Sequence, residues 1–421
     1  MRKQKILLTS LLIFCTCFIV QAQNWELIRL ADSLAMVPPT IDTNPGKEYH
    51  VENLDYGMTI GIERTPGGRI WSCWVGGGDN ADAFFVLAWS DNEGEDWTNT
   101  KVVIDPHDTS LPLKRRTIVG QLWTDPLGRL WLFFDQAMTY FDGRAGNWYT
   151  ICENPDSDNP TWSEPVYLGF GCTLQKPTVM STGEWVLPVS LWPRSRMDIL
   201  LEKEWEENPL KGANTELDDQ RGAHIMVSTD QGETWDFRGK VNFPSPSFDE
   251  HLVIERNDDK WWMTARTGVG IWQSFSTDKG FNWTEPEKYQ DHVNSRHFIV
   301  RLSSGNLLMV RHGMADRKLT SRSHLRAFIS TDEGKTWQGN LLLDERGGIS
   351  YPTGFQAPDG YIYISYDHQR TREGDVLMAR FNENDVLSER IVSRRGELRM
   401  RISKPGRVEE SAANIAARER E

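Results

Sequence analysis

The chain is poor in cysteine and carries no excess of positive charge. Five cysteines occur in 421 residues, and the three outside the N-terminal apolar segment are Cys73, Cys152 and Cys172. Three thiols form neither a disulfide framework nor a zinc site, although Cys152 with Cys172 is one bridge to consider. The formal net charge of −13 disfavours nucleic acid as a partner. The net charge does not exclude an acidic ligand, because a local group of arginines can make one site positive on a negatively charged protein.

Long apolar runs are missing apart from one at the N-terminus. Arg2, Lys3 and Lys5 precede an apolar stretch over 6–20, and Gln-Ala-Gln at 21–23 follows as a cleavage region. This stretch is shorter than a full membrane span, so we expect a cleaved signal peptide over 1–22 and not an anchor. Its removal takes away three positive charges and changes the formal net charge from −13 to −16. We therefore expect a secreted or periplasmic protein with no membrane span after signal removal.

The sequence also lacks the usual signatures of cofactor and metal chemistry. It contains no nucleotide-binding glycine loop, no Ser-His-Asp pattern and no cluster of metal ligands. We therefore predict no cofactor and no metal. Aromatic residues, by contrast, make up 11% of the chain and include 18 tryptophans, so a large core is feasible and disorder is not expected.

One short pattern, Ser-x-Asp-x-Gly-x-Thr-Trp (the Asp-box), occurs four times, at 90–97, 228–235, 276–283 and 330–337. Two copies match fully; the first has Asn92 and Asp96 at the Asp and Thr positions, and the third has Asn282 for Thr. The Asp can cap its own turn, the Gly supplies a positive φ, and the Trp packs under the neighbouring strands. The pattern predicts a hairpin turn with a buried anchor, and its repetition predicts an array of similar β units.

A second repeat indicates how many of these β units the chain contains. A tight turn between two strand-forming stretches recurs six times, at 65–71, 125–131, 180–186, 256–262, 302–308 and 357–363. Four of the six are followed by an Asp-box, the second by a degenerate relative near 155–162, and the third contains an insertion over about 192–221. Six four-stranded units predict an all-β, six-bladed β-propeller. We assign 23–49 to an N-terminal lead-in, 50–393 to the propeller and 394–421 to a charged tail.

The Asp-boxes and the six units together resemble the sialidase superfamily over about residues 50–390. The segment 351–366 is similar to the sialidase segment that begins with a nucleophilic tyrosine, which implies Tyr351 for this role. The resemblance implies Glu250 as its base, at the start of the fourth unit's inner strand, with Arg266 at the far end of that hairpin. A phenol suits this chemistry because the anomeric carbon of a sialic acid carries a carboxylate, which would repel an anionic nucleophile.

The general acid is expected in the loop before the first Asp-box. Three glycines at 76–78 lead into Asp79, and Asp82 follows three residues later. Glycine permits a close approach to the substrate, and either carboxyl can protonate a leaving oxygen. We choose Asp79, at the apex of the turn, and keep Asp82 as the alternative.

Arginines are expected to hold the carboxylate of an acidic sugar, because guanidinium pairs with it through two hydrogen bonds. The resemblance implies Arg266 and Arg322, and Arg296 is a further candidate at the mouth of the fifth unit, beside His297. The sialidase pattern also begins with Phe/Tyr-Arg-Ile-Pro, but here Met58 stands where that first arginine belongs. Two arginines are candidates to replace it, Arg64 and Arg116.

The first hypothesis is an exported, retaining exo-glycosidase that removes a terminal acidic sugar from a glycan or oligosaccharide. Sialic acid is the family's substrate, and Met58 makes another acidic or deoxy sugar an alternative. His251, His297 and His368 allow a second hypothesis, a polysaccharide lyase or a histidine-dependent glycosidase that acts on an acidic polysaccharide. A third is a non-catalytic carbohydrate-binding propeller whose tryptophans stack on sugars.

Overall fold

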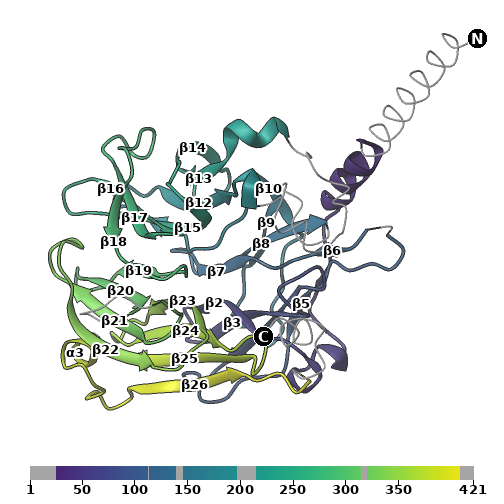
Figure 1. Ribbon diagram of the computed structural model, residues 1–421. Helices are drawn as coiled ribbons and strands as arrows, with labels where there is room; N and C mark the ends of the chain where they lie inside the picture. Colours follow the sequence, from purple (N-terminus) through teal and green to yellow (C-terminus); the bar gives the residue numbers. More distant parts are fainter. Residues whose placement is uncertain (1–24, 112, 139–145, 197–214, 314–319, 408–421) are drawn as a thin grey trace, which may run out of the picture.

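The computed structural model describes residues 25–111, 113–138, 146–196, 215–313 and 320–407. These residues form six antiparallel sheets, each built from consecutive strands, and the sheets are arranged in a ring (Figure 1). The expected all-β, six-bladed propeller is therefore confirmed. The signal peptide expected over 1–22 lies outside the described residues. None of the helices in the described ranges has the length and apolarity that a membrane crossing requires.

Each blade takes its strands in chain order, with the inner strand first. Blade one contains β1 (Ile41–Asp42), β2 (Met58–Arg64), β3 (Ile70–Gly76), β4 (Phe84–Ser90) and β5 (Val102–Ile104), of which β1 is added at the outer edge. Blade two contains β6 (Arg115–Arg116), β7 (Gly120–Thr124), β8 (Leu130–Met138), β9 (Gly146–Cys152) and β10 (Val166–Phe170). Blade three contains β11 (Thr178–Val179), β12 (Trp185–Leu191), β13 (Gly222–Ser228) and β14 (Asp236–Val241).

The remaining three blades have four strands each. Blade four contains β15 (Pro246–Glu255), β16 (Trp261–Thr267), β17 (Gly270–Ser276) and β18 (Glu287–Gln290). Blade five contains β19 (Phe298–Arg301), β20 (Leu307–His312), β21 (Leu325–Ser330) and β22 (Gln338–Asp344). Blade six contains β23 (Ile349–Gln356), β24 (Ile362–His368), β25 (Asp375–Phe381) and β26 (Glu397–Ser403).

Helical segments are short and lie between or before the strands. A helix over 25–35 precedes blade one. Other helical segments include η1 (Lys47–Tyr49), η2 (Val51–Asn53), η3 (Thr215–Gln220) and α3 (Glu383–Leu387). Second strands such as β8 are apolar without alternation, because a strand between two neighbouring blades is buried on both faces.

The Asp-box turns join the third and fourth strands of blades one, three, four and five. In blade three, the Oδ1 atom of Asp230 accepts a hydrogen bond from the Thr234 backbone N–H at 2.9 Å. Gly232 has φ +90°, and the ring of Trp235 packs against that of Trp185, on the second strand of the same blade. The predicted roles of the Asp, the Gly and the Trp are all present in this turn.

Two sequence-based boundaries of the propeller are wrong. The segment 397–403 was assigned to a charged tail, but it forms β26, the outer strand of blade six. Its charged residues alternate with Met400 and Ile402, which are buried, and this period of two suits an outer strand with one covered face. Likewise, β1 lies within the expected lead-in and pairs with β5. The rest of the expected tail, 408–421, lies outside the described residues.

The bridge considered between Cys152 and Cys172 is not formed. Both thiols are free and buried, as is that of Cys73. Cys152 is at the end of β9 in blade two, whereas Cys172 pairs through its backbone with Ser190 of blade three. Burial raises the pKa of the Cys152 thiol to about 11, so it is a packing residue and not a reactive one.

Ring closure brings the last blade against the first two. The Nε2 atom of Gln121 on β7 donates to Thr353 Oγ1 on β23 at 3.2 Å. The hydroxyls of Thr59 on β2 and Ser365 on β24 are also 3.2 Å apart. Segments that are 232 and 306 residues apart in the sequence therefore meet at the channel.

Candidate functional site

Three inner strands have an irregularity at their first residues, at one end of the central channel. The pairing register shifts between Thr59 and Gly61 in β2, around Asp249 in β15, and between Ser350 and Thr353 in β23. A β-bulge re-aims the side chains next to it. The candidate residues Glu250 and Tyr351 lie in two of these bulges.

The backbone at these bulges is strained. Asp249, Glu250 and Tyr351 have φ angles of 55°, 43° and 55°, in the left-handed region that residues other than glycine rarely adopt. Such outliers gather at functional sites because the surrounding structure holds them there. Asp249 is also buried, and its backbone pairs with that of Arg266.

Three guanidinium groups surround the half-buried ring of Tyr351. The Cζ atoms of Arg296 and Arg370 are 4.3 Å and 4.4 Å from the ring centroid, and that of Arg322 is 5.9 Å away. The phenol thus lies in a strongly cationic environment despite the acidic composition of the chain as a whole.

Glu250 is held between two arginines and is 1% exposed. Its Oε2 atom accepts a hydrogen bond from Arg266 Nη1 at 2.9 Å, and its Oε1 atom is 3.9 Å from Arg296 Nε. Burial alone would raise the pKa of Glu250, but Arg266 and Arg296 outweigh it and hold the pKa below its usual range. Glu250 is therefore ionised at neutral pH.

Asn294 accepts hydrogen bonds from both Arg266 and Arg322. Its Oδ1 atom accepts from Arg266 Nε at 2.7 Å, and its backbone carbonyl accepts from Arg322 Nη2 at 3.0 Å. Arg322 also donates to Ser350 Oγ at 2.9 Å, next to Tyr351 in the chain. Burial, assisted by the charges of Arg266 and Arg370, lowers the pKa of Arg322 to about 10.

Arg370 is the functional candidate that the sequence analysis missed. It follows β24, and its Nη1 atom is 2.7 Å from the Sδ atom of Met58, the residue that stands where the sialidase pattern has its first arginine. Its Nε atom is 3.4 Å from Asp367, and its Nη1 atom is 3.7 Å from Asp79. The available signal was an acid followed three residues later by an arginine, directly after the strand hairpin that begins with Tyr351.

The two arginines expected to replace the missing one lie elsewhere. Arg64 is at the opposite end of β2 and pairs with Glu93 of the first Asp-box at 3.0 Å. Arg116 is fully buried in an ion pair with Asp135 of blade two. The structure does not bring either to the group around Tyr351, because each has a carboxylate of its own.

The two aspartates of the glycine loop point to different partners. Asp79 has a side chain that is 44% exposed and faces Arg370, whereas Asp82 pairs with Lys114. Gly77 makes the turn possible: its φ is +76°, and a Cβ atom there would lie 1.9 Å from the Asp82 carbonyl oxygen. Asp79 is therefore the aspartate that the structure brings to the site.

The three candidate histidines are buried and have partners within the fold. His251 Nε2 contacts the His224 carbonyl oxygen at 2.6 Å, His297 Nε2 contacts Thr264 Oγ1 at 2.8 Å, and His368 Nδ1 is 3.5 Å from Asp375. Burial lowers the pKa of His297 to about 3, so its ring stays neutral. Among the described residues, no group of three or more potential ligands could hold a metal ion.

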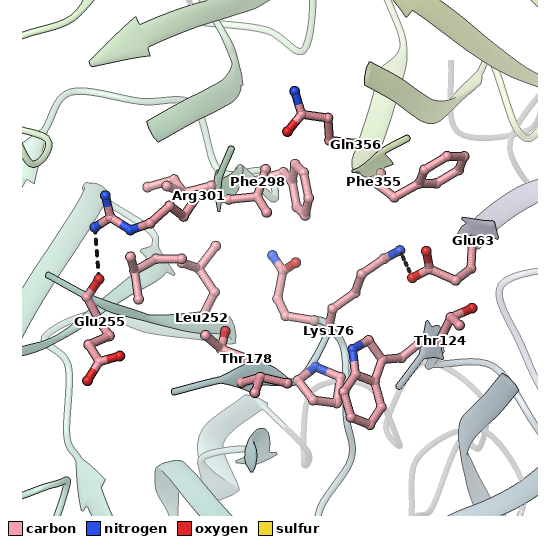
Figure 2. Close-up of a pocket in the computed structure, with 18 residues that line it drawn as sticks. Glu63, Thr124, Lys176, Thr178, Leu252, Glu255, Phe298, Arg301, Phe355 and Gln356 are labelled. Carbon is pink, nitrogen blue, oxygen red and sulfur yellow. Dashed lines mark hydrogen bonds and ion pairs between the residues drawn. The ribbon is translucent and has the colours of Figure 1, made fainter. Parts of the chain in front are cut away.

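The opposite end of the channel holds a separate pocket of about 440 Å³, shown in Figure 2. All six blades contribute to its lining, through Glu63, Thr124, Thr178, Leu252, Phe298 and Phe355 among others. Lys176 spans it and pairs with Glu63 at 2.6 Å. Gln175 separates it from the Tyr351 site by donating to the backbone carbonyls of Glu250 and His297.

The BNR repeat-like domain family matches residues 68–364, which is more than half of the chain. This protein belongs to that family. No curated protein matches it.

Solved structures with this fold include several sialidases. The Hadza microbial sialidase Hz136 is 17% identical with a TM-score of 0.56, over 75% of this chain and 64% of its own length. An intramolecular trans-sialidase from Ruminococcus gnavus is 12% identical with a TM-score of 0.57, over 79% of this chain and 95% of its own. A protein of unknown function from Dyadobacter fermentans is 16% identical with a TM-score of 0.54, over 76% and 93%. At these identities the likeness concerns the fold alone.

Proposed function

We propose that this BNR repeat protein is a retaining exo-glycosidase that removes a terminal acidic sugar, with sialic acid as the first candidate, from glycans. The observation that carries the proposal is the convergence of Arg266, Arg322 and Arg370 around Tyr351, with Glu250 hydrogen-bonded to Arg266. A single guanidinium pairs with a carboxylate through two hydrogen bonds. A group of three therefore favours the binding of a carboxylate still more. The role of the protein on glycans outside the cell, after removal of a signal peptide, is part of the same proposal.

The first half of the reaction attaches the sugar to the protein. Glu250 accepts the phenol proton of Tyr351, and the phenol oxygen forms a bond to the anomeric carbon. The bond from that carbon to the leaving oxygen breaks, and Asp79 gives its proton to this oxygen.

The second half releases the sugar with retained configuration. Water gives a proton to Asp79, and its oxygen bonds to the anomeric carbon. The bond to Tyr351 breaks, and the phenol oxygen takes back its proton from Glu250. Each displacement inverts the anomeric carbon once, so the two together retain it.

The test is hydrolysis of a fluorogenic α-sialoside by the mature protein. We expect turnover by the wild type, none above background for Tyr351→Phe, and a KM raised about 10- to 100-fold for Arg370→Gln, because a charge-assisted hydrogen bond is worth about 1.5–3 kcal/mol. Arg64→Gln is the matched control, because it also removes an arginine, but one that lies in blade one and outside the site, and it should keep wild-type kinetics.

Two results would contradict the proposal. Turnover that survives in Tyr351→Phe would remove the tyrosine mechanism. Binding of sialosides without any turnover by folded wild-type protein would instead favour a non-catalytic carbohydrate-binding propeller.

A further inference from the structure

Arg296 is a buried arginine whose donors are not all used. It lies just before β19, and its side chain is 1% exposed. Its Nε and Nη1 atoms have no hydrogen-bond partner within the described part of the chain. Burial of unsatisfied donors on a charged group is costly, so such a group in a native fold calls for an explanation.

Arg296 lies near both Tyr351 and Glu250. Its guanidinium lies 4.3 Å from the ring centroid of Tyr351 and 3.9 Å from the Oε1 atom of Glu250. That Oε1 atom also has no hydrogen-bond partner in the described ranges. Asn294, by contrast, accepts hydrogen bonds from Arg266 and Arg322. Arg296 therefore lies beside Tyr351 and Glu250, the proposed nucleophile and its base.

The charge on Tyr351 changes during the proposed reaction. Its ring gains negative character whenever the phenol oxygen attacks the anomeric carbon or leaves it. A cation over an aromatic face is attracted to a neutral phenol by about 0.5–2 kcal/mol and more strongly to a ring that carries charge. A fixed cation in a water-poor site is effective because it needs no reorganisation when the charge develops.

We propose that Arg296 stabilises the negative charge that develops on Tyr351, and so serves the nucleophile and not the carboxylate of the sugar. This inference rests on the glycosidase function proposed above. Arg296 exchanges no proton in either half of the reaction. It is a positioning residue, a fourth arginine of the site with a task different from that of Arg266, Arg322 and Arg370.

The experiment compares Arg296→Gln and Arg296→Lys with the wild type on a fluorogenic α-sialoside, with free sialic acid as a competitive inhibitor. We expect Arg296→Gln to lower kcat by about 10²- to 10³-fold while KM and the inhibition constant change by less than about 3-fold. Arg296→Lys keeps the charge and should lose no more than about 10-fold in kcat. Arg370→Gln should show the reverse, with raised KM and inhibition constant.

Three outcomes decide the matter. A raised KM and inhibition constant with unchanged kcat in Arg296→Gln would assign Arg296 to the carboxylate and overturn the inference, while the glycosidase function would stand. Equal loss in both variants, together with lower melting temperatures, would make Arg296 a structural residue and also overturn it. Absence of turnover by the wild type would remove the proposed function itself, before any variant is measured.

Discussion

Met58 and Arg370 occupy one place in the molecule although 312 positions separate them in the chain. The sulfur of Met58 contacts the guanidinium of Arg370, which reaches the site from blade six. A cation delivered from β24 can therefore serve where the sialidase pattern delivers one from β2.

An exchange of the two residues tests this relation. Arg370→Met should raise the KM for an α-sialoside about 10- to 100-fold, because it removes a charge-assisted hydrogen bond to the carboxylate. The double variant Met58→Arg/Arg370→Met should regain at least part of this loss, since it returns an arginine to the same place. A double variant no better than Arg370→Met, with an intact melting transition, would show that the two positions are not equivalent.

Asp249 gives the site a pH-dependent contribution to stability. Burial, reinforced by the charge of Glu250, raises the pKa of Asp249 to about 7 from an ordinary value of 3.8. Between these two pH values the folded protein holds a proton that the unfolded chain has released. The free energy of unfolding therefore falls as the pH rises through this window, and the stabilisation is lost above pH 7.

Substitution of Asp249 with Asn should remove this dependence. Relative to the variant, the wild type should lose up to about 4 kcal/mol between pH 4 and pH 8, because one pKa unit corresponds to 1.36 kcal/mol. The measurement is urea unfolding of both proteins at intervals over this range. Parallel curves for the two proteins would show that Asp249 titrates normally in the folded state.

At the scale of single elements, the bulges and the Asp-box turns have different structural roles. The bulges at the first residues of β15 and β23 break the alternation of the strand and aim Glu250 and Tyr351 at the channel. The Asp-box turns lie at the other ends of the blades and fix the packing of one blade on the next.

Two glycines with the same φ separate the cost of the left-handed conformation from the cost of a steric clash. Gly232 in an Asp-box and Gly305 in a hairpin turn both have φ +90°, but a Cβ atom would lie 2.8 Å from Trp131 at Gly232 and meet nothing within 4 Å at Gly305. Gly305→Ala should cost about 1 kcal/mol in unfolding free energy from the left-handed conformation alone. Gly232→Ala should cost about 1–3 kcal/mol more, because the tryptophan has to move.

Chemical denaturation of the two variants under the same conditions measures this difference. Equal losses for Gly232→Ala and Gly305→Ala would mean that the space beneath the Asp-box turn is not tightly filled.

At the scale of the whole molecule, the ring depends on contacts across the channel. Lys176 of blade three donates to Glu63 of blade one at 2.6 Å and to the Ile62 carbonyl at 2.7 Å. Both side chains are nearly buried, with exposures of 11% and 9%. This pair joins blades that are not neighbours in the sequence.

Removal of one partner should be worse than removal of both. Lys176→Met leaves Glu63 without its counter-charge and should lower the free energy of unfolding by about 3 kcal/mol. The double variant Lys176→Met/Glu63→Gln should recover most of the loss, because no uncompensated charge remains. Melting temperatures of the two variants and the wild type check this, and a double variant as unstable as Lys176→Met would contradict it.

The sequence by itself determined the number of blades and the chemistry of their turns. Both depend on local patterns: strand-forming stretches around tight turns, and an Asp-box whose hydrogen bonds close within five residues. The candidates Tyr351, Glu250 and Arg266 came from the resemblance to the sialidase superfamily, in which each has a fixed place relative to a hairpin of its own blade. The outer strand β26 was missed because its many charged residues were taken as a sign of a solvated tail, although they alternate with the buried Met400 and Ile402.

Only the tertiary structure decided which arginines meet at Tyr351. Arg370 is near Met58 because ring closure sets blade six beside blade one, and the spacing of residues along the chain contains no trace of that contact. Arg64 and Arg116, which are nearer to Met58 in the sequence, are paired with Glu93 and Asp135. A bulge likewise shifts the aim of a strand by one residue, and its position depends on the partner strand as much as on its own sequence.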